Sequence, residues 1–280
     1  MENLVTSSFR LGVLGGGQLG RMLALAAANW DIQTYCLDKS EHAPARNFCH
    51  GFKHGLITSF DDVVSLAKHV DMVTIETDHA NADALAFLEE KGMGTFPASK
   101  SLRIIQDKGL QRQFCRDRGI PVPKFKLFAT KEELMHAVSS NTWEFPFIVK
   151  ARSAGYDGKG VFLVKDRGGL EDIPPKDLLA EELVDIDKEL AVIAIRNGSG
   201  QIASYPPSEL FMDPGGYLVR HLICPADIPE RTKHRAEELA HELIDAFDIK
   251  GLLAIEMFLD HRGNLCINEC SPRPHNSGHH

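Results

Sequence analysis

The sequence lacks several features that would assign it to a special class of protein. No apolar run approaches the roughly 20 residues that a transmembrane helix needs. The N-terminal segment MENLVTSSFR has no basic start, apolar middle or small-residue cleavage site of a signal peptide. Neither internal repeats nor low-complexity tracts occur. We therefore expect a soluble globular protein without a membrane partner.

Basic residues and paired cysteines are also scarce. The 31 Lys and Arg residues are outnumbered by 39 Asp and Glu residues, which gives a formal net charge of -8. This charge argues against nucleic acid as a partner, because nucleic-acid binding needs basic patches. The six cysteines, at positions 36, 49, 115, 224, 266 and 270, have no C-x-x-C spacing. They are typical of reduced thiols in a cytoplasmic protein, not of a disulfide or zinc framework.

The hydrophobic pattern divides the chain into two parts of different build. From residue 10 to about residue 97, strand-like runs alternate with helix-like runs, which is typical of a parallel sheet with crossover helices. In this part the predicted strands are 10–15, 31–38, 54–58 and 72–77, and the predicted helices are 18–30 and 60–69. A helix over 101–119 follows. Beyond residue 125 the predicted strands are 124–128, 146–152, 160–166, 178–184, 189–197 and 200–206, with helices at about 130–140 and 231–249. We predict an α/β lobe of Rossmann-like type followed by an α+β part.

An apolar run near the N-terminus ends in a glycine turn. Gly15, Gly17 and Gly20 have G-x-G-x-x-G spacing, and Asp38 follows Gly20 by 18 residues. Three interpretations are open for this turn: a dinucleotide fingerprint, a site for another ligand with a phosphate or carboxylate, and a structural turn. Gln18 adds a side-chain amide that could hydrogen-bond a ligand.

The C-terminal segment contains two apolar strands on either side of the sequence HRGN, which predicts a β-hairpin. A loop of Arg262 and Gly263, or of residues 261–264, gives one register, in which Glu256 lies directly opposite Glu269. Two carboxylates in this position repel each other, so one takes up a proton or a cation lies between them. Because paired carboxylates with space for water and phosphate are typical of Mg²⁺ sites, we predict a metal site. A solvated outer face is the alternative.

A second glycine-rich segment, residues 153–160, lies between two predicted strands. Its glycines allow the backbone to fold over a phosphate chain, although the spacing is not that of a Walker loop. Lys150 ends the preceding apolar strand, where a buried ammonium group needs an anionic partner. Three acids, Glu181, Glu182 and Glu189, follow at the ends of two later strands. They could hold ribose hydroxyls or an exocyclic amine, or they could form an ordinary charged turn.

Together these features resemble an ATP-grasp ligase, a family in which ATP lies between two α+β lobes behind a Rossmann-like lobe. Four motifs are similar, more narrowly, to those of the 5-(carboxyamino)imidazole ribonucleotide synthetases of purine biosynthesis: GGGQLGRM, TIETDHAN, SAGYDGKG and NECSPRPHNSGHH. The resemblance runs from about residue 11 to the end of the chain. It implies a substrate-binding Rossmann-like lobe (1–97), an ATP-grasp small lobe (98–180) and a large lobe with the metal site (181–280). Family members continue with a small C-terminal domain, so the chain resembles a C-terminally truncated member, and we expect it to bind ATP and to carboxylate poorly.

The resemblance implies a ligase that phosphorylates bicarbonate with ATP to carboxyphosphate and then carboxylates aminoimidazole ribonucleotide, with release of ADP and phosphate. It implies ATP and Mg²⁺ as cofactors and small-molecule substrates, and it is compatible with a homodimer. The implied ATP-binding residues are Lys108, Lys150, Lys159, Glu181, Glu182, Val184 and Glu189, and the implied Mg²⁺ ligands are Glu256 and Glu269. The implied substrate-binding residues are Gly17, Gln18, Leu19 and Glu76, and the implied catalytic residues are Tyr156, Asp157, Arg273, His275 and Asn276.

The match departs from the family pattern in the TIETDHAN motif. Asp78 and Ala80 stand where the pattern has Glu and Val, while Glu76 is retained. The alternatives are another ATP-grasp carboxylate–amine ligase or formate-dependent transferase, a nicotinamide oxidoreductase, and an ATP-binding module without activity. On the ligase interpretation, the first glycine turn holds the ribonucleotide substrate and Asp38 is structural.

Overall fold

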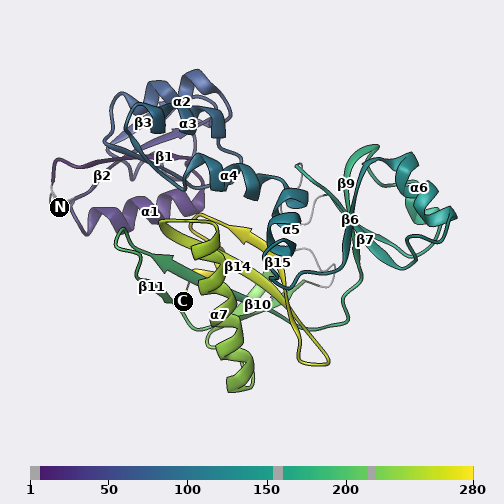
Figure 1. Cartoon of the computed structure of the whole chain (residues 1–280). Helices are drawn as coiled ribbons and strands as arrows, with labels where there is room; N and C mark the ends of the chain where they lie inside the picture. The colour runs from purple at the N-terminus through teal and green to yellow at the C-terminus, as the bar shows by residue number, and fades with distance from the viewer. Residues whose placement is uncertain (1–6, 154–159, 214–218, 280) are drawn as a thin grey trace.

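Three β-sheets organise the chain (Figure 1). The structure is a computed structural model that describes residues 7–153, 160–213 and 219–279. A five-stranded parallel sheet forms the N-terminal lobe, a four-stranded antiparallel sheet forms the small lobe, and an antiparallel sheet of six strands forms the large lobe. The predicted class, α/β followed by α+β, is confirmed.

The N-terminal lobe has the strand order β3-β2-β1-β4-β5. Its strands are β1 (Arg10–Leu14), β2 (Gln33–Asp38), β3 (Gly51–His54), β4 (Met72–Ile75) and β5 (Gly94–Phe96), and its helices are α1 (Gln18–Ala28), α2 (Phe60–Ala67) and α3 (Ala82–Glu90). The strand predicted at 54–58 is wrong, because the strand ends at His54. The Leu56 N–H donates to the Asp62 carboxylate at 2.9 Å, and Ser59 caps α2, so the chain turns here toward the helix.

The helix predicted over 101–119 is instead two helices, α4 (Ser99–Gln106) and α5 (Lys108–Arg116). Asp107 separates them with an extended backbone, φ -110° and ψ 107°. Its carboxylate caps α5 by accepting the Gly109 N–H at 2.8 Å, and it also pairs with Arg152 at 2.6 Å. Lys108 therefore lies on the first turn of α5, at the cavity described below.

The small lobe has the strand order β6-β9-β7-β8. It contains β6 (Phe125–Thr130), α6 (Lys131–Ser139), β7 (Phe147–Ala151), β8 (Val161–Val164), the short helix η1 (Gly168–Leu170) and β9 (Lys176–Glu182). One face packs on α6 around Leu134, Phe147 and Leu178. Because β9 continues to Glu182, it crosses the division expected at residue 180.

The large lobe has the strand order β13-β12-β10-β14-β15, with β11 paired to β10. It contains β10 (Ile186–Arg196), β11 (Ile202–Ser204), β12 (Ser208–Met212), β13 (Val219–Ile223), α7 (Glu230–Ala246), β14 (Gly251–Asp260), β15 (Leu265–Ser271) and η2 (Asn276–Gly278). Helix α7 covers one face of the sheet, where Leu239 and Leu243 pack with Leu190 and Val192. Since side chains alternate along a strand, the neighbouring residues of β10 face the opposite side of the sheet, which they share with Glu256 of β14.

Candidate active site

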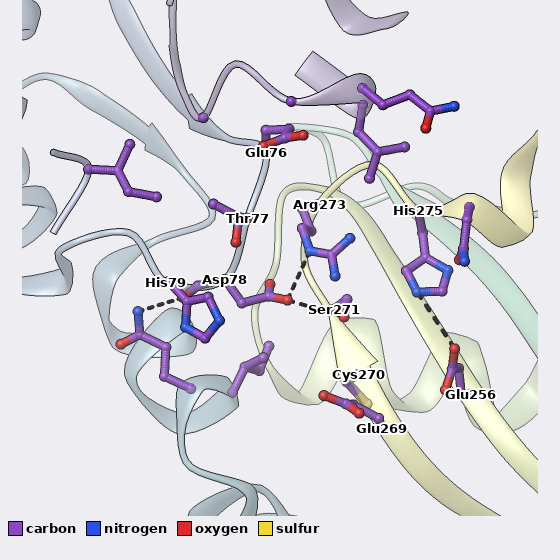
Figure 2. A pocket seen from close by; sticks show the side chains of 18 of the residues that line it. Glu76, Thr77, Asp78, His79, Glu256, Glu269, Cys270, Ser271, Arg273 and His275 are labelled. Atoms are coloured by element: carbon purple, nitrogen blue, oxygen red, sulfur yellow. Dashed lines mark hydrogen bonds and ion pairs between the residues drawn. The ribbon is translucent and has the colours of Figure 1, made fainter. Parts of the chain in front are cut away.

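A cavity of about 1000 Å³ connects the glycine turn of the N-terminal lobe with the terminal hairpin of the large lobe. Figure 2 shows side chains from both lobes directed into this space. Ten of the residues predicted for the site line it: Gly17, Gln18, Leu19, Glu76, Lys108, Glu256, Glu269, Arg273, His275 and Asn276. Segments far apart in the sequence thus meet at one place.

Glu76 shapes the glycine turn at one end of the cavity. It follows β4, and its carboxylate accepts the Gly20 N–H at 3.3 Å at the start of α1. A Cβ atom at Gly17 would lie 2.5 Å from Glu76 Oε1, and one at Gly15, where φ is +112°, would also meet this carboxylate. The turn therefore needs glycine because the carboxylate lies against the main chain. Burial raises the pKa of Glu76.

Two further contacts hold the middle of the turn. Asp38, at the end of β2, accepts the Gly16 N–H at 2.8 Å and the Ser40 N–H at 2.8 Å. The Ala45 N–H donates to the Gly16 carbonyl at 2.9 Å. Asp38 therefore has the structural role expected for it.

The terminal hairpin places Glu256 of β14 directly opposite Glu269 of β15, as predicted. The register expected beyond this pair, toward the loop, is wrong. There Met257 pairs with Ile267, one residue out of step, because Asn268 is inserted as a β-bulge. The bulge allows Asn268 to reach Lys150, whose Nζ donates to Asn268 Oδ1 at 3.0 Å.

The two opposed glutamates have different electrostatic environments. Lys108 Nζ donates to Glu269 Oε1 at 2.6 Å and helps to lower the pKa of Glu269, against the effect of burial. Burial, followed by the charges of Glu269 and Glu189, raises the pKa of Glu256 to about 7. Two hard carboxylate ligands lie together here, and a divalent cation between them would relieve the repulsion, so the donor set fits Mg²⁺.

The residues described by the structure contain no group of three or more His, Cys, Asp or Glu side chains arranged to hold a metal ion. A metal at Glu256 and Glu269 would therefore need further ligands from phosphate oxygens and water. This incomplete set is typical of Mg²⁺, which usually keeps several waters and binds substrate phosphates.

Lys150 lies in a buried ion cluster between the lobes. Its Nζ is 2.8 Å from Glu181 Oε2, and the other oxygen of Glu181 accepts a hydrogen bond from Arg112. Arg112 also donates to the Asn268 carbonyl at 2.6 Å. These charges lower the pKa of Glu181 to about 2 although burial opposes this shift. Both carboxylate oxygens of Glu181 therefore already have cationic partners. A nucleotide would contact the main chain of this residue instead of its side chain.

A second interaction joins the N-terminal lobe to the end of β15. Asp78 accepts from Arg273 Nε at 2.9 Å and from Ser271 Oγ at 3.4 Å (Figure 2). Its other oxygen, Oδ1, is buried and has no hydrogen-bond partner in the described structure. Burial raises the pKa of Asp78, and Arg273 acts in the opposite direction. Asp78 thus orients Arg273.

His275 follows Arg273 and faces Glu256. Its Nε2 lies 3.6 Å from Glu256 Oε1, and its Nδ1 is 2.9 Å from Ser277 Oγ. Burial, with a further contribution from Arg273, lowers the pKa of His275 to about 4. At neutral pH the imidazole is therefore neutral, with one nitrogen able to donate and the other to accept a hydrogen bond.

The other predicted nucleotide-binding residues lie farther along the interlobe strands. Glu182 is exposed and paired with Lys124 at 2.6 Å, and with Val184 it lines a second cavity of about 480 Å³. Glu189 of β10 pairs with Phe258 of β14, so it lies on the same sheet face as Glu256. Burial raises the pKa of Glu189. Tyr156, Asp157 and Lys159 lie outside the described residues.

Sequence reasoning missed Arg112, Asn268 and the pairing of Asp78. A signal existed for Arg112, because it follows Lys108 by one helical turn and therefore shares its face of α5. No signal existed for Asn268, since strict alternation places it on the face opposite Glu269.

Comparisons with known proteins identify the families to which the two parts of the chain are similar. Residues 113–280 match the ATP-grasp domain family, and residues 9–106 match the ribonucleotide synthetase preATP-grasp domain. The N5-carboxyaminoimidazole ribonucleotide synthase of Bacillus subtilis is 30% identical over 275 residues, which are 96% of this chain and 71% of that protein. The N5-carboxyaminoimidazole synthase of Aspergillus clavatus, solved with ADP and 5-aminoimidazole ribonucleotide, is 30% identical with a TM-score of 0.89. That match covers 98% of this chain and 72% of the solved one.

The chain belongs to the N5-carboxyaminoimidazole ribonucleotide synthetase family of ATP-grasp proteins. The chloroplastic phosphoribosylaminoimidazole carboxylase of Vigna aconitifolia is a further relative, 35% identical over 283 residues. This chain spans about half the length of that carboxylase, 48%, while the match covers 96% of the chain itself. In the described residues, no helix is long and apolar enough to cross a membrane.

Proposed function

We propose that the chain performs the ATP-dependent carboxylation of aminoimidazole ribonucleotide by bicarbonate. The product would be the N-carboxylated nucleotide, formed through carboxyphosphate with release of ADP and phosphate. One observation carries the proposal: a continuous cavity joins the glycine turn at Glu76 to the opposed carboxylates Glu256 and Glu269. A ribonucleotide bound at the glycine turn and a triphosphate bound at the two carboxylates would lie in the same cavity.

At the nucleotide end, the cations of the site would bind phosphate oxygens. Lys108 already lies at the cavity, and Lys150 is held beside it by Glu181 and Asn268. A transferring phosphoryl group develops negative charge, which lysines oppose. Glu256 and Glu269 would hold Mg²⁺, which would neutralise charge on the phosphates. Lys159, Glu182, Val184 and Glu189 remain proposed contacts to ATP.

At the substrate end, the first glycine turn would receive the ribonucleotide. Free main-chain N–H groups at a helix N-terminus favour an anionic or hydrogen-bonding ligand, and Gln18 and Leu19 are at the start of α1. Glu76 would then act by holding the turn open through the Gly20 N–H and by facing the ligand. Tyr156 and Asp157 are proposed to orient the substrate amine.

Between the two ends, Arg273, His275 and Asn276 would surround bicarbonate and carboxyphosphate. Asp78 fixes Arg273, whose remaining guanidinium N–H groups can donate to an anion. Since the pKa of His275 is lowered to about 4, its imidazole would donate a hydrogen bond without carrying a charge. Carboxyphosphate reacts with water, so the reaction would need water to be excluded from this part of the cavity.

The test is ADP release by the chain with ATP, Mg²⁺ and bicarbonate, measured with and without aminoimidazole ribonucleotide. The proposal requires release that depends on bicarbonate and yields carboxylated nucleotide in equal amount. Formate in place of bicarbonate detects a formate-dependent transferase. Titration with NADH tests the oxidoreductase alternative. ATP binding without any turnover would leave an ATP-binding module and refute the proposed activity for this chain.

We also propose a cytoplasmic location, because all six cysteines are free thiols. A homodimer is proposed as the assembly, and sedimentation or light scattering of the purified chain measures it directly.

A further inference from the structure

Four lysine and arginine residues in the described part of the chain line the large cavity, and they differ in their partners. Three of them pair with a carboxylate: Lys108, Arg152 and Arg273. The fourth, Lys39, is exposed and has no ion pair with any described residue. The ammonium group of Lys39 can therefore bind an anionic ligand without first giving up a partner in the protein.

Lys39 lies beside the first glycine turn. It directly follows Asp38, whose two carboxylate oxygens accept the N–H groups of Gly16 and Ser40. The carbonyl of Lys39 accepts a hydrogen bond from His54 Nε2 at 2.9 Å, at the end of the neighbouring strand β3. The main chain of Lys39 is therefore held between two strand ends, while its long side chain remains able to turn toward a ligand.

The strand order places Lys39 and Glu76 on opposite sides of the glycine turn. Strands β2 and β4 flank β1 in the parallel sheet, so the carboxyl ends of all three strands meet at one edge. The glycine turn follows β1, Lys39 follows β2, and Glu76 follows β4. Ligands of open α/β sheets bind at this edge. A ligand that crosses the turn from the Glu76 side would therefore reach Lys39 with its other end.

The proposed reaction determines which end of the ribonucleotide lies at Lys39. In that reaction the exocyclic amine attacks a carboxyl group held by Arg273 and His275. Arg273 contacts Asp78, which is two residues after Glu76, so the reacting groups meet on the Glu76 side of the turn. The aminoimidazole ring must therefore lie on this side. The 5′-phosphate is at the opposite end of the nucleotide and is directed toward Lys39.

We propose that Lys39 binds the phosphate of aminoimidazole ribonucleotide, an inference that rests on the proposed function. An ammonium group donates charge-assisted hydrogen bonds to phosphate oxygens. Helix α1 begins at the same turn, no described side chain caps its N-terminus, and its first main-chain N–H groups also favour an anion. Lys39 thus distinguishes the ribonucleotide from the corresponding riboside, which has no phosphate.

The experiment compares the ribonucleotide with the riboside by calorimetric titration into wild type, Lys39→Met and Lys53→Met. Lys53 is on β3 of the same lobe but does not line the cavity, so its substitution removes the same charge away from the ligand. Lys39→Met should weaken ribonucleotide binding by about 10-fold or more and change riboside binding by less than about 2-fold. Lys53→Met should change neither, and Lys39→Arg should retain most of the affinity for the ribonucleotide. Circular dichroism establishes that each variant is folded.

Three outcomes would overturn the proposal: unchanged ribonucleotide binding in Lys39→Met, an equal loss for ribonucleotide and riboside, or an equal loss in Lys53→Met. Carboxylation by Lys39→Met with the wild-type KM for the ribonucleotide would refute the phosphate contact and leave the proposed function standing.

Ribose 5-phosphate separates the phosphate contact from the proposed reaction. It should bind wild type more tightly than Lys39→Met. If this difference is found in a chain without carboxylation activity, the proposed function fails and the phosphate contact stands. Inorganic phosphate tests the other source of the same anion and should bind more weakly than ribose 5-phosphate, because it makes no contact through a ribose. Equal affinities would assign Lys39 to free phosphate and overturn the proposal.

Discussion

Carboxylates have different partners at the two ends of the cavity. In the N-terminal lobe, Glu76 and Asp38 accept main-chain N–H groups of the glycine turn. In the large lobe and at its border, Glu269 pairs with Lys108, and Glu181 pairs with Lys150 and Arg112. The first pair of acids fixes a backbone shape, and the second set balances buried cations.

The difference shows how each end would respond to a ligand. The glycine turn can accept a ligand without a change of charge, because its acids are occupied by amides. At the hairpin, Glu256 has no ion pair with Lys or Arg in the part of the chain that the structure describes, and its pKa is raised. A cation can be added there at a gain in free energy, which is what a metal–triphosphate site needs.

The largest expected effect is on stability, from Glu181→Gln. Removing this charge leaves Arg112 and Lys150 buried without their anion, which should lower the free energy of unfolding by roughly 3–5 kcal/mol. Urea denaturation followed by circular dichroism measures it. The matched control is Glu238→Gln on α7, whose partner Arg235 is exposed, and it should change stability little. Equal effects of the two substitutions would contradict the assignment of a buried ion cluster.

Glu256→Gln should reduce Mg²⁺-dependent ADP release by at least about 100-fold, the cost of losing one preorganised stabiliser of developing charge. The amide keeps the shape of the side chain but weakens its affinity for a hard cation. Steady-state kinetics over a range of Mg²⁺ concentrations separates a loss of metal affinity from a loss of turnover. Retention of wild-type rates would show that this carboxylate holds no metal. The hairpin end would then not differ from the glycine turn in binding a cation.

The raised pKa of Glu256 also predicts a pH effect on stability. In the unfolded chain this acid releases its proton near pH 4.5, while in the folded protein it does so near pH 7. Folding therefore takes up a proton between these values, and wild type should lose stability relative to Glu256→Gln as pH rises from about 5 to 8. The difference should reach up to roughly 3 kcal/mol. Melting temperatures of both proteins without metal or ATP test this, and a gap independent of pH would contradict it.

Local sequence patterns predict only part of the fold and of the candidate site. Glu256 lies opposite Glu269 as predicted, but the expected loop does not by itself produce this pairing. Leu259 pairs with Leu265, one residue out of the expected register, and the bulge at Asn268 restores the register at Glu256. The bulge at Asn268 could not be foreseen, because it is stabilised by Lys150 and Arg112 from other lobes. The parallel sheet of the N-terminal lobe was predicted correctly from the alternation of strand-like and helix-like runs, which is also local information.

The break between α4 and α5 shows the same limit. Helical periodicity continues through Asp107, so the local sequence predicts one uninterrupted helix. The pairing of Asp107 with Arg152, a residue next to the second glycine-rich segment, favours an extended backbone there. Strands β12 and β13 were also missed, because each has only five residues and little periodicity of its own.

At the glycine turn, Gly17→Ala tests the N-terminal end. The new Cβ would lie 2.5 Å from Glu76 Oε1 and displace the carboxylate. We expect binding of aminoimidazole ribonucleotide to weaken by roughly 10-fold, about 1.4 kcal/mol, with ATP affinity unchanged, as measured by calorimetry. Gly198→Ala is the matched control, because nothing lies within 4 Å of its added Cβ. An equal loss of ATP affinity in Gly17→Ala would argue against separate binding sites for the two nucleotides at the two ends of the cavity.

The smallest effect is expected from Asp78→Asn, at the junction of the two ends. The amide oxygen can still accept from Arg273 Nε, so the side chain keeps its place while the ion pair is lost. Because Arg273 is then held less firmly, we expect the KM for bicarbonate to rise by about 3-fold to 10-fold, with kcat changed less. Asp78→Ala also removes the hydrogen bond and should raise KM further. If both variants kept the wild-type KM, Asp78 would stabilise only the contact between lobes, and Arg273 would be oriented by its neighbours on the chain.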